Sequence, residues 1–430
     1  MKSSTDAGRP TALPPRGYAP RMRRPLGVFV PVVFLVAACA TSPVPPPGAT
    51  ATPPPSVAVT PEATAAPPLP TGTPAPTPLP CIASGTQAQI NARLVRPNAE
   101  AVLCQGAVFD LLGPVVFRFS GQKVYTEGHP TGASRAVLRI GSPTLDHAVT
   151  MLDMDHAELT NVIVDGDRPG LGPMSGDGLI LAGGMATGQV IAHNKIGNTR
   201  TWSSVHLFEG SGTTPCVDAL VEDNDIGPAG TSDNWADGIS LACTKSTVKG
   251  NRITDATDGA IVVFGAPGSQ IVGNFITART RTLLGGINLV DVGPYAGDYT
   301  ATVVRENTIN AAGAVIRIGL AMGERVWGCL PADSTHAVAH GATVTGNTLR
   351  GTHMQYGYAV SGVKDWTVTG NVDLARHRGT PSVPCGATVA SAPAGFLLQR
   401  ATSHGTFQRE FANARLDLAL WAIVDPLPGH

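Results

Sequence analysis

A six-residue motif recurs seven times between residues 191 and 373 and limits the possible folds more than any other feature of this sequence. Each copy starts with Val or Ile and has Asn at its fourth position, and five copies end in Ile. The motif asparagines are Asn194, Asn224, Asn251, Asn274, Asn307, Asn347 and Asn371. They follow one another at intervals of 23 to 40 residues. Such a period indicates a solenoid, a propeller or an array of small repeats.

Several repeat architectures have periods in this range. Leucine-rich repeats require Leu at most apolar positions, whereas β-branched residues dominate here, and propeller blades need four strands in about 40 to 45 residues. A right-handed parallel β-helix fits better, because each of its coils has three short strands and the loops between them can lengthen freely. Inward β-branched side chains then stack on their equivalents in the next coil, and the asparagines form a hydrogen-bonded ladder.

Over residues 150–375 the chain resembles the right-handed β-helix repeat proteins of the pectate-lyase-like superfamily. The resemblance implies an all-β fold and no particular activity. A second set of segments fits this fold, because each precedes an asparagine motif and carries alternating apolar residues. These segments, predicted to be the first strands of successive coils, are 177–181, 237–241, 258–262 and 286–289. Asn161 marks one earlier coil in a shifted register.

The first forty residues carry an export signal. Arg21, Arg23 and Arg24 precede an apolar run, Leu26–Ala38, which is too short to span a bilayer and suits the apolar region of a signal peptide. Its end, Leu-Val-Ala-Ala-Cys39, resembles the lipobox of bacterial lipoproteins. The resemblance implies cleavage before Cys39, lipidation of Cys39 and a membrane anchor at the cell envelope. The alternative is an ordinary signal peptide followed by a coincidental cysteine.

Composition divides the remainder of the chain into segments. Residues 41–80 contain fifteen prolines and a single charged residue, Glu62, so we expect residues 39–80 to be a disordered linker that favours extended polyproline II. Residues 81–150 are predicted to form an N-terminal cap and the first coils, and residues 151–393 the main β-helix. Apolar and aromatic residues gather again in 394–430. We assign that segment to a C-terminal cap, because open β-helix ends expose unpaired strand edges.

The cysteine positions give an independent test of the coil register. Without Cys39, six of the seven cysteines remain, an even number that favours disulfides in an exported protein. Cys216 and Cys243 each lie eight residues before a motif asparagine. Equal offsets place them about 4.8 Å apart on adjacent coils, within disulfide range. We therefore predict a Cys216–Cys243 bond. The other predicted pairs are Cys81 with Cys104, in the N-terminal cap, and Cys329 with Cys385, by elimination.

The charge balance argues against a nucleic-acid partner. The chain has 30 Lys and Arg residues against 31 Asp and Glu residues, for a formal net charge of −1. A nucleic-acid-binding domain is expected to have a basic surplus. We expect a monomer.

Functional chemistry is expected on the outer face of one sheet, where one side chain per coil lies between two inward apolar residues. We predict that this column consists of Ile180, His206, Ser240, Val262, Asn288 and Arg317. Charged and aromatic residues flank it, namely Glu209, Asp237, Asp258, Asp291, Trp202 and Trp235. Neighbouring carboxylates, an imidazole and aromatic rings suit cleavage of a polysaccharide by hydrolysis or by β-elimination.

Roles follow from residue type. Asp237, Asp258 and His206 are the candidate catalytic residues, because carboxyl groups on consecutive coils lie about 5 to 10 Å apart, in the range of glycosidase acid and base pairs. Ser240, Asn288, Arg317 and Trp235 are the candidate substrate-binding residues. Asp233, Asp237 and Asp258 could ligate Ca²⁺. The alternatives are that each Asp-Gly forms a tight turn and that His206 is an ordinary surface residue.

Two resemblances bear on the activity. The segment 234–239, Asn-Trp-Ala-Asp-Gly-Ile, is similar to the Asn-x-Asp-Gly-Ile signature of polygalacturonases. It departs from that family, because Thr257-Asp258 replaces a pair of aspartates and no Gly-His-Gly follows. Polysaccharide lyases of this fold commonly use an Arg or Lys base, but Arg317 is expected roughly 14 Å from Asp237. The sequence therefore predicts an envelope lipoprotein that binds, and could cleave, a polysaccharide. The alternative is a non-catalytic surface, adhesion or structural module.

Overall fold

The computed structural model of this protein describes residues 80–212, 214–327, 338–379 and 391–415, all within one compact unit, Ala75–His430. The predicted signal peptide, the linker and three predicted cysteine sites, Cys39, Cys329 and Cys385, lie outside the described residues. In the part of the chain that is described, no helix has the length and apolarity that a membrane span requires.

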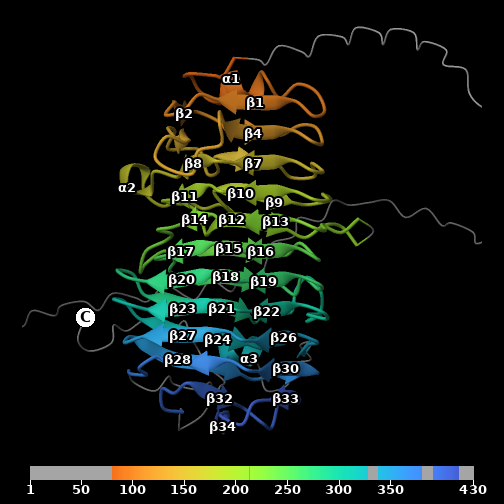
Figure 1. Cartoon of the computed structure of the whole chain (residues 1–430), viewed down its shortest axis with the longest axis vertical. Coiled ribbons are helices and arrows are strands. Elements are labelled where there is room, and N and C mark those ends of the chain that lie inside the picture. The colour runs from red at the N-terminus through yellow and green to blue at the C-terminus, as the bar shows by residue number, and fades with distance from the viewer. Residues whose placement is uncertain (1–79, 213, 328–337, 380–390, 416–430) are drawn as a thin grey trace, which may run out of the picture. The chain divides into compact units, whose positions relative to one another are not determined.

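Three long parallel sheets make up the described fold (Figure 1), and each coil supplies one strand to each sheet in turn. The first sheet consists of β1 (Glu100–Leu103), β4 (Lys123–Thr126), β7 (Glu158–Thr160), β10 (Val190–Ala192), β13 (Leu220–Glu222), β16 (Thr247–Lys249), β19 (Gln270–Val272), β22 (Val303–Arg305), β26 (Thr343–Thr345), β30 (Trp366–Thr369) and β33 (Gly405–Phe407).

The second sheet consists of β2 (Val108–Leu111), β5 (Ala136–Ile140), β8 (Val162–Asp165), β11 (Lys195–Gly197), β14 (Asp225–Ile226), β17 (Arg252–Thr254), β20 (Phe275–Ala278), β23 (Thr308–Ala311), β27 (Thr348–Gly351) and β31 (Val372–Asp373).

The third sheet consists of β3 (Val115–Val116), β6 (Val149–Thr150), β9 (Ile180–Gly183), β12 (Ser203–Phe208), β15 (Asp237–Leu241), β18 (Gly259–Val263), β21 (Leu283–Leu289), β24 (Ile316–Met322), β28 (Met354–Val360), β32 (Phe396–Leu398) and β34 (Ala412–Asn413). Short additions are the pair β25 (Ala339–His340) and β29 (Val363–Lys364), and the helices α1 (Gln87–Asn91), α2 (Arg168–Leu171) and α3 (Glu324–Trp327).

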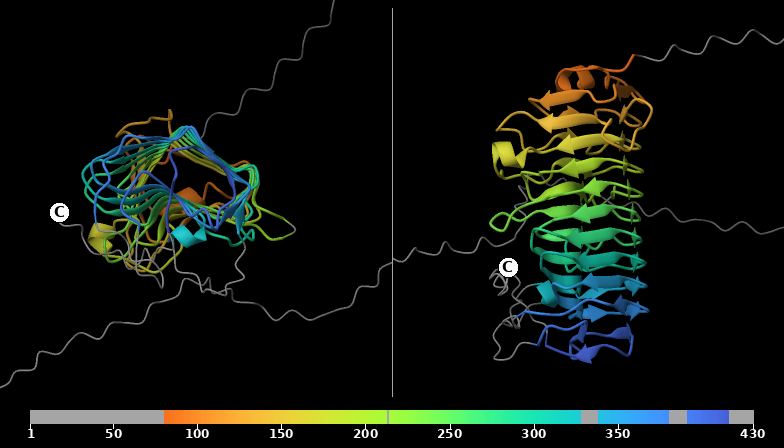
Figure 2. Two further views of the ribbon diagram at one scale, coloured as in Figure 1. Left: turned by 90° about the horizontal axis from the view of Figure 1, so that it is seen from below. Right: turned by 60° about the vertical axis from the view of Figure 1, so that its left-hand side comes forward.

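This arrangement is the predicted right-handed parallel β-helix. Viewed along the stacking direction, the strands of successive coils superimpose around a common interior (Figure 2). The first motif residue pairs directly with its equivalent on the next coil, as Ile191 does with Val221 and Val221 with Val248. These side chains are buried in the main apolar core. A column of aliphatic side chains therefore stabilises the stack through apolar burial.

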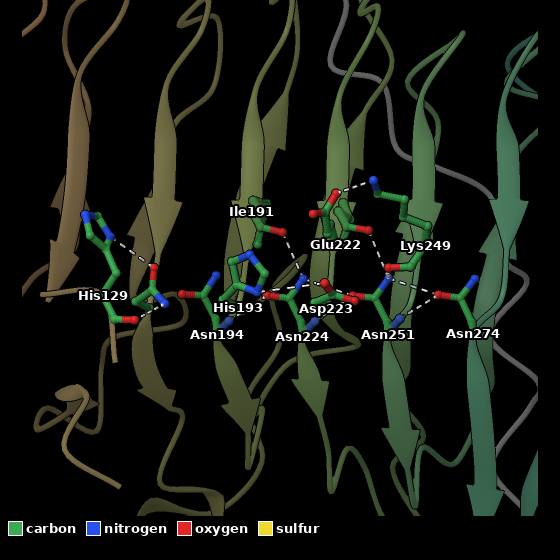
Figure 3. Close-up of polar contacts among 12 residues, drawn as sticks. His129, Ile191, His193, Asn194, Glu222, Asp223, Asn224, Lys249, Asn251 and Asn274 are labelled. Atoms are coloured by element: carbon green, nitrogen blue, oxygen red, sulfur yellow. Dashed lines mark hydrogen bonds and ion pairs between the residues drawn. The ribbon is translucent and has the colours of Figure 1, made fainter. Parts of the chain in front are cut away.

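The motif asparagines form the predicted ladder beside this core (Figure 3). The Asn224 backbone N–H donates to Oδ1 of Asn251 at 3.0 Å, and the Asn251 N–H donates to Oδ1 of Asn274 at 3.0 Å. The ladder reaches back to Asn161, whose register is shifted by one residue as expected, because the Val162 N–H donates to Asn194 Oδ1.

The last rung of the ladder is not an asparagine. At the C-terminal end Asn371 donates its backbone N–H to Oε1 of Gln408 at 3.0 Å. Gln408 has no copy of the motif around it, so only the tertiary structure shows that it belongs to the ladder.

Both described disulfides were predicted. Cys216 and Cys243 are bonded across adjacent coils with Cα atoms 4.7 Å apart, and Cys81 and Cys104 are bonded with Cα atoms 4.9 Å apart. The first bond confirms the coil register deduced from offsets to the asparagines.

The two ends of the described stack are closed differently. Helix α1 lies at the N-terminal end (Figure 1), where Thr86 and Gln89 form a capping box and Ile90 is fully buried. At the other end the aromatic residues of the predicted cap occupy further strands and turns. Phe411 packs edge-on against Phe396 and Phe407, with ring centroids 5.3 and 6.0 Å apart. Strands β32, β33 and β34 thus extend the sheets as far as Asn413.

Candidate functional site

The predicted column exists on the third sheet, with two corrections. His206 pairs with Ser240, Ser240 with Val262, and Val262 with Asn288, so these four side chains follow one another coil by coil. The first position belongs to Leu181 and not to Ile180, which pairs with Val205.

Arg317 was wrongly placed in the column, because the next position after Asn288 is Ala321. The error came from the pattern Ile316-Arg317-Ile318, which looks like a charged residue between two core residues. Ile316 does lie in the main core, but Ile318 packs in a separate apolar cluster with Tyr356 and Ala359. Strand β24 therefore does not alternate simply between core and solvent. Arg317 is buried and donates from Nη1 to Oε1 of Gln355 at 3.1 Å.

The column is covered, contrary to the expected exposed face. His206 is 7% exposed, and Ser240 and Asn288 are 0% exposed. Neighbouring aromatic rings account for the burial of His206, since Phe208 stacks on it at 3.6 Å between centroids and Trp202 packs edge-on at 4.6 Å. The alternation of apolar and polar residues along each strand predicts on which face of the sheet these side chains lie. It carries no information on what packs over them.

Asp237 bridges two coils through both of its carboxyl oxygens. Oδ2 accepts a hydrogen bond from the Ser240 hydroxyl at 2.8 Å, and Oδ1 accepts one from the Gly259 backbone N–H on the next coil at 2.8 Å. Burial and the nearby charge of Asp258 raise the pKa of Asp237 well above its ordinary value, against the effect of those two hydrogen bonds. Asp237 thus has a structural role in addition to any chemical one.

Three further carboxyl groups belong to the following coils, and the charges of two of them, Asp258 and Asp291, act on Asp237. Asp258 directly precedes β18, Asp291 follows β21, and Glu324 begins α3 after β24. Burial, the charge of Asp258 and the charge of Glu324 raise the pKa of Asp291 to about 7. We call Asp237, Asp258, Asp291 and Glu324 the carboxylate row. The sequence pattern predicts Asp291 only as a neighbour of the column, because Asp291 lies beyond the end of its strand.

His206 is a poor candidate for a proton acceptor. Burial lowers the pKa of its imidazole to about 3, so the ring is neutral at physiological pH and only weakly basic. Its Nδ1 is buried and has no hydrogen-bond partner among the described residues.

Asn288 presents an unusual buried amide. Neither Oδ1 nor Nδ2 has a hydrogen-bond partner in the described part of the chain, and an unsatisfied buried polar group costs about 1–3 kcal/mol. The amide lies against two glycines: a Cβ at Gly259 would lie 2.7 Å from Nδ2, and one at Gly285 would lie 2.0 Å from Oδ1. Both glycines are therefore required for this packing.

The three predicted Ca²⁺ ligands do not come together. Asp233 is exposed and accepts a hydrogen bond from Ser232, while Asp237 is buried. Among the described residues, the group of three metal-ligating types with ligand atoms within 4.8 Å of one another is His193, Glu222 and Asp223, on a different turn. The failure is one of geometry, because Asp233 and Asp237 are close in sequence but belong to a turn and a strand. Trp235, predicted to bind substrate, is half-buried and donates from Nε1 to the Ser232 carbonyl at 2.8 Å.

Comparisons with known proteins agree with the fold. A family model described as a right-handed beta helix region matches residues 177–373. None of the curated proteins matches the chain. Similar solved structures include an alginate lyase from Paenibacillus sp. str. FPU-7, at 18% identity and a TM-score of 0.40, with 69% of this chain and 96% of that chain covered.

Two other similar structures are of complexes. A DFA-IIIase from Arthrobacter chlorophenolicus A6 in complex with DFA-III has 14% identity and a TM-score of 0.43, covering 76% of this chain and 92% of that one. A tailspike protein of E. coli bacteriophage HK620 in complex with a pentasaccharide has 12% identity and a TM-score of 0.47, covering 76% and 62%. The family match and the three parallel sheets show that the chain carries the right-handed parallel β-helix fold.

Proposed function

We propose that this protein is an exported polysaccharide hydrolase in which Asp291 is the general acid and Asp258 is the paired carboxylate. The observation that carries the proposal is the pKa of Asp291, raised to about 7 by burial and by the charges of Asp258 and Glu324. A carboxyl group whose pKa is raised toward neutrality, next to a second carboxyl group, is the arrangement that glycoside hydrolysis requires.

Two properties of the candidate bases favour hydrolysis over β-elimination, namely the weak basicity of His206 and the position of Arg317. Elimination needs a group that removes a proton from carbon, and His206 is too weakly basic for this at neutral pH. Arg317 lies outside the column that contains His206 and Asn288. The carboxylate row is therefore the better-supported chemical centre.

A chain-like substrate suits the direction of the carboxylate row. Its members come from four consecutive coils of the third sheet, and coils are stacked at about 4.8 Å. The row thus spans four coils, more than the two carboxyl groups that are needed to cleave one bond. An extended polymer running along the stack would meet the three members of the row that are not fully buried, Asp258, Asp291 and Glu324.

The proposal also places the protein at the cell envelope. The Cys81–Cys104 and Cys216–Cys243 bonds are typical of proteins in oxidising compartments outside the cytoplasm. The lipobox-like segment before Cys39 and the proline-rich linker support a lipid anchor that holds the β-helix at a distance from the membrane.

The test is an assay on a panel of neutral and uronate polysaccharides, with and without Ca²⁺. We expect new reducing ends without ultraviolet-absorbing unsaturated products. Asp291→Asn and Asp258→Asn are each expected to lower kcat/KM about a hundredfold or more. Because Asp291 must be protonated, activity should fall as pH rises above about 7.

Asp365→Asn is the matched control, since its side chain is 72% exposed on a separate turn, and it should keep wild-type activity. Unsaturated products, or full activity in Asp291→Asn, would contradict the proposal.

A non-catalytic binding or adhesion module is the second candidate. Its support is the burial of the column and the structural hydrogen bonds of Asp237 to Ser240 and Gly259. This function predicts no cleavage of any polymer, together with a polymer that raises the melting temperature.

A further inference from the structure

A second cluster of ligand-type side chains lies away from the third sheet, on the turn between the first and second sheets (Figure 3). His193 precedes the ladder residue Asn194, and Glu222 and Asp223 precede Asn224 on the next coil. One ligand atom from each of these three residues lies within 4.8 Å of the other two. His193 Nδ1 is 3.9 Å from Asp223 Oδ2.

Three hydrogen bonds fix the backbone at His193 and Asp223. The His193 N–H donates to the Glu222 carbonyl at 3.0 Å, and the Asp223 N–H donates to the Lys249 carbonyl at 3.1 Å. Arg135 donates from Nη1 to the His193 carbonyl at 2.8 Å. His193 and Asp223 both adopt the left-handed conformation, with φ of 58° and 50°. Two equivalent turn positions on adjacent coils therefore present their side chains in parallel.

On the next coil, the position equivalent to Asp223 is Gly250, and its lack of a side chain matters for the cluster. A Cβ at Gly250 would lie 2.1 Å from Asp223 Oδ1. The missing side chain leaves room for the Asp223 carboxylate between the coils, where it can turn toward His193. Other coils have Gly250, Gly273, Gly346 and Gly370 before the ladder asparagine, and Glu306 has a glycine on both neighbouring coils. Among the motif coils, ligand-type side chains at this position on two adjacent coils are therefore particular to His193 and Asp223.

The donor set selects the class of metal. One imidazole nitrogen and two carboxylates suit Zn²⁺ and its neighbours Co²⁺, Ni²⁺ and Cu²⁺, whereas Ca²⁺ and Mg²⁺ prefer oxygen donors alone. Tetrahedral Zn²⁺ with bonds of about 2.0–2.2 Å places its ligand atoms about 3.3–3.6 Å apart. Side-chain rotations that move the ligand atoms by about an ångström bring the three groups to that spacing.

We propose that His193, Glu222 and Asp223 form a binding site for a divalent transition metal of the Zn²⁺ class, which links two adjacent coils. Lys249 sets the affinity, because its Nζ forms an ion pair with Glu222 Oε2 at 2.7 Å. The ammonium group competes with the metal for this carboxylate. The site lies on a different turn from the carboxylate row and is independent of the proposed hydrolase activity.

The experiment is calorimetric titration of Zn²⁺ into untagged, chelator-treated protein, repeated with Co²⁺ to read the visible absorption of the bound ion. We expect one saturable site and a higher melting temperature with Zn²⁺. His193→Ala is expected to weaken binding at least about tenfold. Lys249→Gln is expected to strengthen it about two- to fivefold, since it removes a competing surface ion pair.

His340→Ala is the matched control. His340 also faces an acidic side chain, with Nε2 3.5 Å from Asp298 Oδ1, but no third ligand joins that pair among the described residues. This variant should bind Zn²⁺ as the wild type does. Absence of saturable binding to the wild type, or equal affinities for wild type and His193→Ala when both show the same circular dichroism spectrum, would overturn the proposal.

Discussion

At the scale of single residues, a buried asparagine amide is fully hydrogen-bonded in the ladder but has no partner among the described residues at Asn288. Each central ladder asparagine uses its whole amide: Asn251 donates from Nδ2 to the Val221 carbonyl at 2.9 Å and accepts the Asn224 N–H on Oδ1 at 3.0 Å. Asn288 is equally buried, but its amide has no partner among the described residues. The first amide therefore stabilises the stack, while the second needs water or a ligand to satisfy it.

Replacement of a central ladder residue should strongly destabilise the fold. Asn251→Ala removes the partners of the Val221 carbonyl and the Asn224 N–H, and we expect the free energy of unfolding to fall by about 2–4 kcal/mol. Asn310→Ala is the control, since Asn310 is half-buried on β23 outside the ladder, and should change stability by less than about 0.5 kcal/mol. Urea denaturation measures both. Equal effects of the two substitutions would contradict a special role for the ladder.

At the scale of elements, a titratable pair joins the second and third sheets near the C-terminal end. His377 Nε2 lies 2.7 Å from Asp373 Oδ2 at the end of β31, and His377 Nδ1 lies 2.9 Å from the Gln355 carbonyl in β28. Burial disfavours the protonated imidazole, but these two contacts and the charge of Asp373 outweigh it. The pKa of His377 is therefore raised above its ordinary value of 6.5.

This pair predicts a stability that depends on pH. A raised pKa in the folded state means that protonated His377 contributes its full stability below pH 6.5 and loses it as pH rises through the folded-state pKa. His377→Gln should cost about 1–3 kcal/mol at pH 6 and progressively less at higher pH. Urea unfolding of both proteins from pH 6 to 9 measures the difference, and a constant difference across that range would exclude the linkage.

At the scale of the whole described stack, the two proposed sites lie at separate places. The carboxylate row lies on the third sheet, and the His193, Glu222 and Asp223 cluster lies on the turn between the first and second sheets. Since every coil pairs only with its neighbours, a substitution at one place should leave the other intact.

The anchor proposal is tested on the intact chain. Cys39→Ser should abolish labelling with a radioactive fatty acid and move the protein from the detergent phase to the aqueous phase after phase separation, because lipid attachment is what holds such a protein to a bilayer. The Cys216→Ser variant loses the Cys216–Cys243 disulfide but keeps the lipobox-like sequence, and it should still be labelled. Fatty-acid labelling of Cys39→Ser would rule out this cysteine as the lipid site.

The local sequence determined the architecture of this protein, because a β-helix repeats one set of short-range rules. Spacing of the asparagines predicted the coil register, and through it the Cys216–Cys243 bond and the alignment of His206, Ser240 and Asn288. Only the tertiary structure decided what covers each side chain and which charges meet. Packing between coils explains what the sequence did not predict, because the sequence of a single coil carries no information on it. It determines the true position of Arg317, the burial of the column, the separation of Asp233 from the other two predicted Ca²⁺ ligands and the raised pKa of Asp291.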